Sequence, residues 1–145
     1  KNPNAAPTDF MKLAEIYINK AKKDPAKKVE NIDKAIGVYA KLAEKYPTLK
    51  PFAKLQEGNT AFQNELDDKA IAAYTEVINE LEAKQCDEDE LSYLKTSYQY
   101  MGFIYTYDKQ DFNTAKPYWD KLLKLDPQNK LANDAYEKAG LKPGE

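Results

Sequence analysis

Few side chains in this sequence have the types and spacing that catalysis or metal binding requires. A lone thiol, Cys86, precedes the acidic run at residues 87–90, and a lysine-rich stretch occupies residues 20–28. The thiol could act as a nucleophile, the carboxylates could bind Ca²⁺, and the lysines could attract an anionic partner. Whether any of these chemistries is available depends on the residues around them.

The composition lacks the partners that such chemistry needs. The 145 residues include no histidine and one cysteine, so nothing activates Cys86, and neither a disulfide nor a Cys-pair metal site can form within the chain. An EF-hand loop beginning at Asp87 would need Gly and Glu where Ser92 and Tyr98 stand. We therefore expect no enzyme activity, no catalytic residue, no metal and no cofactor.

The charged residues argue against nucleic acid as a partner. All 22 basic residues are lysines, the net charge is −2, and the pI is near 5.4, so arginine is absent as a bidentate phosphate or guanine contact. The lysines at 20–28 are better explained as a solvated helix end with Asp24 and Glu30 nearby. No stretch approaches the roughly 18 apolar residues of a membrane span.

A spacing of large and small residues recurs three times along the chain. The clearest copy reads Tyr98-x-x-Met101-Gly102-x-x-Tyr105, then Ala115-x-x-x-Trp119, then Pro127. The first copy reads Phe10-x-x-Leu13-Ala14-x-x-Tyr17, then Ala35-x-x-x-Tyr39, then Pro47. A degenerate copy reads Lys54-x-x-Glu57-Gly58-x-x-Ala61, then Ala70-x-x-x-Tyr74. The apolar spacing within each copy predicts helices.

The elements that carry this pattern predict one domain. We expect a linker at 1–7, a single domain at 8–145 with repeats at about 8–47, 48–86 and 87–127, and a C-terminal capping helix at 128–139. Asp87 and Glu90 have the spacing of a capping box. Pro117 is tolerable in its helix if that helix starts near Asn113, because proline in a first turn removes no hydrogen bond.

The pattern resembles the tetratricopeptide repeat (TPR) family over about residues 8–140. The resemblance implies an all-α fold, an α-α superhelix of three antiparallel helix pairs plus a capping helix. It also implies that the small residues lie where the two helices of a pair cross and that the aromatic residues fill space between repeats. In the family, 12 residues separate the small residue of the first helix from that of the second. Here the separation is 21 residues from Ala14 to Ala35 and 13 from Gly102 to Ala115. A third departure is that the second repeat lacks its closing proline. We expect longer helices in the first pair, one extra residue in the third turn, and a fourth helix that continues toward Gln85.

The resemblance also implies that the first helix of each pair lines a concave groove. The candidate protein-binding residues are those that this spacing places on the groove face: Asn19, Phe52, Asn59, Phe62, Gln63, Gln99, Phe103, Thr106 and Tyr107. Aromatic rings among adaptable amides suit peptide recognition. The alternative is that Phe52 and Phe62 pack between repeats. A lysine–asparagine clamp for C-terminal carboxylates is incomplete, because Thr8, Phe52 and Thr96 occupy its lysine places.

We expect a non-enzymatic scaffold that binds a protein or peptide segment in this groove. A scaffold, dimerisation or regulatory domain of a larger secreted or envelope protein stays open as the alternative. Because the first residue is Lys1, we expect a fragment or a processed product, so a homodimer and further repeats in the parent chain both remain open.

Overall fold

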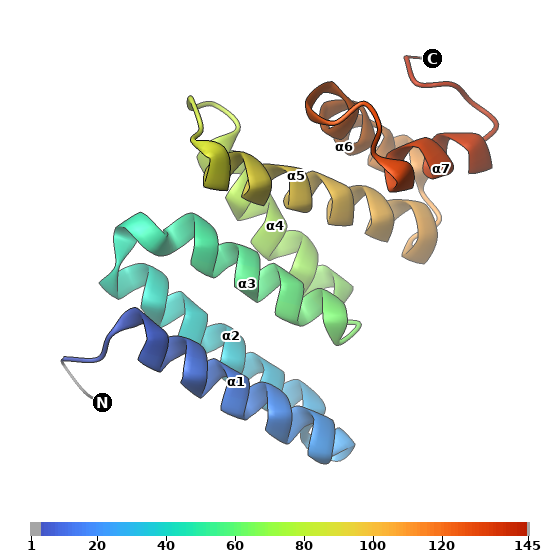
Figure 1. The fold of residues 1–145 in the computed structure, drawn as a ribbon. Helices are drawn as coiled ribbons and strands as arrows, with labels where there is room; N and C mark the ends of the chain where they lie inside the picture. Colours follow the sequence, from blue (N-terminus) through green and yellow to red (C-terminus); the bar gives the residue numbers. More distant parts are fainter. Residues whose placement is uncertain (1–3, 145) are drawn as a thin grey trace. The chain divides into compact units, whose positions relative to one another are not determined.

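A computed structural model describes residues 4–144, in two compact units whose boundary lies between Val77 and Ile78. Residues 1–3 of the expected linker and residue 145 lie outside the described part. Over residues 4–144 every regular element is helical, which confirms the all-α fold class. Consecutive helices pack as antiparallel pairs (Figure 1), an arrangement consistent with a TPR-like helical solenoid.

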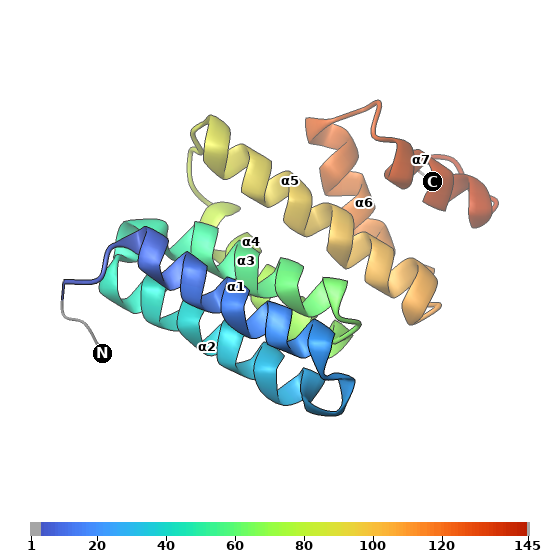
Figure 2. The same cartoon turned by 60° about the horizontal axis from the view of Figure 1, so that its bottom comes forward.

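The first unit contains three complete helices and most of a fourth. They are α1 (Pro7–Lys23), α2 (Lys28–Lys45), α3 (Lys50–Gln63) and α4 (Asp67–Leu81), and the unit boundary falls inside α4. Short 3-10 turns at Pro25–Lys27 and Pro47–Leu49 each begin with proline, whose fixed φ suits a helix start. Helix α2 packs against both α1 and α3 (Figure 2).

The second unit contains α5 (Glu88–Phe103), a π-helical turn η3 (Ile104–Asp108), α6 (Phe112–Leu125) and α7 (Lys130–Lys138). Helix α5 packs against both α6 and α7. The expected capping box opens α5: the backbone N–H of Glu90 donates to Asp87 at 2.8 Å, and the N–H of Asp87 donates to the Glu90 carboxylate at 3.1 Å. Two orphan donors of the helix end are thereby satisfied.

Two of the spacing departures have the expected structural result. The insertion in the first repeat lengthens its helices, since α1 and α2 have 17 and 18 residues whereas α3 and α4 have 14 and 15. The extra residue between Gly102 and Ala115 is absorbed by the wide π-helical turn η3. This turn places the Thr106 hydroxyl 2.8 Å from the indole N–H of Trp119, which donates to it.

Two expected helix boundaries are wrong. Helix α4 ends at Leu81, well before Gln85, and a turn follows. Helix α6 begins at Phe112, so Pro117 is its sixth residue and lies beyond the first turn. The proline leaves only the Asn113 carbonyl without its helical donor, and Asn113 is exposed to water. Helix α7 is capped by Asn129, whose side chain accepts from the Ala132 N–H at 3.0 Å.

The glycines of the repeat pattern make room for an aromatic ring from the partner helix. A Cβ placed on Gly58 would lie 2.6 Å from the Tyr74 ring, and one placed on Gly102 would lie 2.6 Å from the Trp119 ring. Both rings are fully buried. Tyr74 and Trp119 therefore pack within their own helix pair, and not solely between repeats as the sequence pattern suggested.

The degenerate second repeat replaces an apolar contact with an ion cluster. Lys54 and Glu57 occupy the places of Tyr98 and Met101 in the clearest copy. Lys54 Nζ lies 2.9 Å from a carboxylate oxygen of Glu57 and 2.9 Å from one of Glu76. Burial raises the pKa of the Glu57 carboxyl, and the Lys54 ammonium opposes that rise. The repeat pattern is degenerate at these positions because an ion cluster stands where the other repeats have apolar contacts.

Adding one methyl group at Gly102 is expected to destabilise the second unit. Gly102→Ala forces the Trp119 ring to move, so the free energy of unfolding should fall by about 2 kcal/mol in urea titration. The matched control is Gly37→Ala in α2, where no described atom lies within 4 Å of the added Cβ. That variant should gain about 0.5–1 kcal/mol from helix propensity. Equal effects at the two sites would contradict the packing argument.

Removing the cation of the ion cluster should give a pH-dependent loss of stability. Lys54→Met leaves Glu57 buried without its partner, so we expect a loss of about 2 kcal/mol near pH 7. A raised carboxyl pKa means that the native state takes up a proton more readily than the unfolded chain, so the loss should shrink as the pH falls toward about 5.

The apolar double variant Lys54→Met/Glu57→Met supplies the control, because it removes both charges together. It should unfold at nearly the wild-type urea midpoint at both pH values. A pH-independent loss in the single variant would show that Glu57 stays ionised without its partner.

Candidate functional site

The candidate residues of the first unit lie mainly on α3. Asn59 is half-buried, and its side-chain oxygen accepts a hydrogen bond from the Tyr74 hydroxyl at 2.6 Å. Gln63 is exposed one turn further along, and Phe62 is half-buried beside it. Phe52 packs against the core formed by α1, α2 and α3, which favours the structural interpretation for that residue. The surface offered by α3 is therefore largely amide.

In α1 the only candidate is Asn19, which is exposed. It occupies the place in its repeat that Gln63 and Tyr107 occupy in theirs, each five residues after the small residue of the pattern. The three repeats thus present Asn, Gln and Tyr at one equivalent position.

The candidates of the second unit follow one face of α5 and η3. Gln99, Phe103 and Tyr107 are spaced by four residues, and all three are half-buried. The Phe103 and Tyr107 ring centroids are 4.8 Å apart with the rings tilted by 46°. The ammonium of Lys138 lies 5.5 Å from the Tyr107 ring centroid, close enough for a cation–π contact. This face combines an aromatic pair with a charge at one end and an amide at the other.

The ends of this face open into two small pockets. Gln99 accepts a hydrogen bond from the Asn129 side chain at 3.1 Å and lines a pocket of about 400 Å³ with Thr96. Tyr107 lines a pocket of about 380 Å³ with Gln110 and Phe112. Thr106 also lines the pocket at Tyr107, but it is buried, and its hydroxyl accepts the hydrogen bond of the Trp119 indole.

The surroundings of Cys86 do not favour a reactive thiolate. Burial and nearby carboxylates raise the pKa of its thiol, which keeps it protonated at neutral pH. The neighbouring Tyr98 hydroxyl donates to Glu82 at 2.6 Å, and Lys121 pairs with the same carboxylate at 3.0 Å. The hydrogen bond from Tyr98 lowers the pKa of Glu82, whereas burial raises that of Tyr98. These groups link the turn after α4 to α5 and α6.

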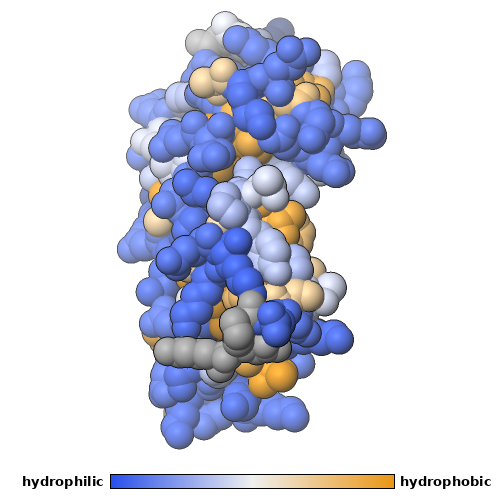
Figure 3. Space-filling model, turned by 90° about the vertical axis from the view of Figure 1, so that its left-hand side faces the viewer, coloured by the Kyte–Doolittle hydropathy of each residue, from blue (hydrophilic) through white to orange (hydrophobic). Residues whose placement is uncertain are grey.

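Neither a metal centre nor a membrane span is found in the part of the chain that the structure describes. Among residues 4–144, no group of three or more Cys, Asp or Glu side chains is placed to hold a metal ion. No helix within the same range has the length and apolar character needed to cross a bilayer. The face drawn in Figure 3 is mainly hydrophilic, with hydrophobic side chains in small patches.

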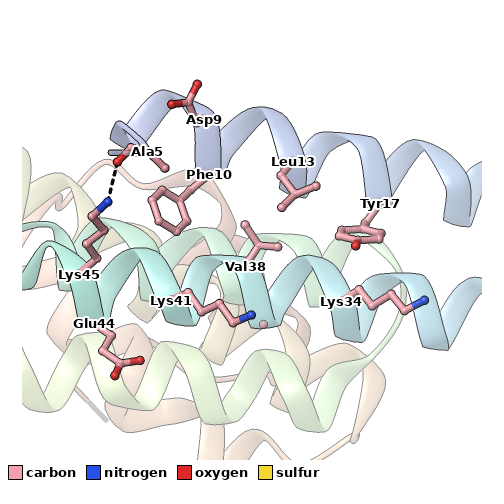
Figure 4. A pocket seen from close by; sticks show the side chains of 11 residues that line it. Ala5, Asp9, Phe10, Leu13, Tyr17, Lys34, Val38, Lys41, Glu44 and Lys45 are labelled. Atoms are coloured by element: carbon pink, nitrogen blue, oxygen red, sulfur yellow. Dashed lines mark hydrogen bonds between the residues drawn. The ribbon is translucent and has the colours of Figure 1, made fainter. Parts of the chain in front are cut away.

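The sequence interpretation missed a pocket that lies between α1 and α2. Its volume is about 1060 Å³, and Figure 4 shows its apolar side chains between the two helices. Phe10, Leu13 and Tyr17 come from α1, and Val38 comes from α2. All but Val38 are residues of the repeat pattern, which was interpreted as packing alone.

Comparison with known proteins supports the repeat assignment. A family model described as tetratricopeptide repeat matches residues 10–48, which cover α1 and α2. Searches of curated proteins and of solved structures found no significant match. The family is typically a non-catalytic module for protein–protein interaction. The match covers residues 10–48 alone, and the paired helices over the described residues are consistent with the same type of repeat.

Proposed function

We propose that this chain is a non-enzymatic scaffold that binds an extended or helical segment of a partner protein in a groove formed by the first helices of its pairs. The family match indicates a protein-interaction scaffold, and the groove is our extension of it. The observation that supports the extension best is the face of Gln99, Phe103 and Tyr107 in the second unit.

This face has the properties of a peptide-recognition surface. A tilted pair of aromatic rings offers contact area at low entropic cost, and each end of the face lines a pocket that could take a side chain. Lys138 and the Gln99 amide supply a charge and hydrogen-bonding groups that could fix the register of a bound segment. The amides of Asn59 and Gln63 on α3 offer hydrogen bonds suited to an extended backbone.

Truncating the aromatic pair should weaken partner binding. A partner captured by pull-down from native cells would be purified and titrated by calorimetry. Phe103→Ala/Tyr107→Ala should raise its Kd by about 10-fold or more, because central aromatic residues carry most interface energy. Asn59→Ala should raise it by a smaller factor. The control is Tyr118→Ala in α6, which should leave the Kd unchanged. The Tyr118 ring stacks on that of Tyr105 in η3. A Kd unaffected by the aromatic double variant would exclude this face.

Thr106 should affect stability but not binding. Thr106→Val leaves the Trp119 indole N–H buried without an acceptor, so unfolding should become easier by about 1–2 kcal/mol. The partner Kd should stay within about 2-fold of the wild type. Weaker binding with unchanged stability would instead make Thr106 a contact residue.

A further inference from the structure

The orientation of the Gln99 side-chain amide is fixed by its neighbour Asn129. The Asn129 side-chain oxygen accepts from the Ala132 N–H at 3.0 Å, so its NH₂ group is the part that faces Gln99. That NH₂ group donates to the Gln99 side-chain oxygen at 3.1 Å and to the Asp126 carboxylate at 3.3 Å. Because the helix cap and the carboxylate permit only this orientation of Asn129, the Gln99 oxygen is the acceptor and the Gln99 NH₂ group remains as a donor.

Three candidate binding groups offer only donors. Among residues 4–144, the Gln99 NH₂ group has no acceptor. In the first unit, the Tyr74 hydroxyl donates to the Asn59 side-chain oxygen at 2.6 Å, and the Asn59 NH₂ group has no acceptor within the described range. The Lys138 ammonium lies over the Tyr107 ring and forms no ion pair with any described residue. A bound segment must therefore supply hydrogen-bond acceptors.

The two ends of the face on α5 and η3 favour acceptors of different charge. Two carboxylates, Glu88 and Asp126, line the pocket at Gln99 together with one ammonium, that of Lys95. A further carboxylate would be repelled there, so the acceptor that fits Gln99 is a neutral carbonyl. At the other end, Lys138 is the one charged residue, among those described, that lines the pocket. That pocket suits an acidic side chain.

The acidic residues closest in sequence to this second pocket do not oppose Lys138 inside it. Asp134 is held in an ion pair within α7, and Asp111 caps α6. Glu137 and Asp108 are exposed to water and do not line the pocket. Water and salt screen such exposed charges, whereas a carboxylate within the pocket would lie beside the Lys138 ammonium.

We propose that the segment bound on this face is extended and presents a neutral carbonyl to Gln99 and an acidic side chain to Lys138, with an apolar side chain on the Phe103 ring between them. The inference rests on the groove proposed above and adds the chemistry of its occupant. Gln99 and Tyr107 are eight residues apart, which is about 12 Å along a helix and so about four residues of an extended chain.

A phage-displayed library of random peptides tests the proposal. Each peptide has about 10 residues, enough to span the face in extended form. Peptides retained by the wild-type chain should carry Asp or Glu about two positions from an apolar residue. Lys138→Glu should abolish the enrichment of acidic residues and raise the Kd of the best peptide, measured by fluorescence anisotropy, by about 10-fold or more. The control is Lys124→Glu, the same charge change at an exposed site on α6 that lines neither pocket.

Gln99→Glu tests the donor at the other end of the face. A glutamate side chain can still accept from Asn129, but it has no NH₂ group to donate. The Kd of the best peptide should rise by about 5-fold or more. The rise should persist at high salt, which screens the added charge but cannot restore a donor. Thermal unfolding followed by circular dichroism checks that each variant folds as the wild type does.

The outcomes separate this inference from the groove on which it rests. Peptides that lose binding in Phe103→Ala/Tyr107→Ala but show no acidic residue, or that bind Lys138→Glu or Gln99→Glu as tightly as the wild type, would overturn the inference and leave the groove. Peptides whose binding does not depend on Phe103 and Tyr107, or a library that yields no binding peptide, would overturn both.

Discussion

Contact between an aromatic ring and a bare glycine backbone determines how the helices pair. In both units, the ring of a buried Tyr or Trp on the second helix occupies the space that a Cβ would fill on the first, at Gly58 with Tyr74 and at Gly102 with Trp119. Interior packing is dense, so such contacts fix where the two helices cross. The crossing point in turn decides which residues of the first helix turn inward and which remain on the surface.

The surface residues follow from that register. Residues one and five positions after the glycine keep part of their surface open to water, as Asn59 and Gln63 do on α3 and as Phe103 and Tyr107 do on α5–η3. The glycine–aromatic contact is thus repeated in both units, while the side chains at these positions change from amides to aromatic rings. A repeat built in this way can vary the side chains at these positions without altering the contacts that hold the helices together.

The sequence was sufficient to predict the paired helices, the longer first pair and the extra residue after Gly102, because these depend on local spacing. It could not predict that the extra residue would form a π-helical turn that buries Thr106, since the partner Trp119 is thirteen residues away. It also misplaced the start of α6, where the Asp111 side chain caps the helix at Thr114. The pocket at Leu13 depends on how the side chains of α1 and α2 pack together, which a repeat pattern does not record.

The most direct test of the central claim is to map a bound partner segment on the chain by NMR. With ¹⁵N-labelled protein and the captured segment, the largest amide shift changes should fall on the outer positions of α3 and α5–η3, around Gln63, Phe103 and Tyr107. Shift changes confined to the second helices of the pairs, around Ala72 in α4 and the residues next to Pro117 in α6, would contradict the account. They would show that the partner binds the second helices and not the first.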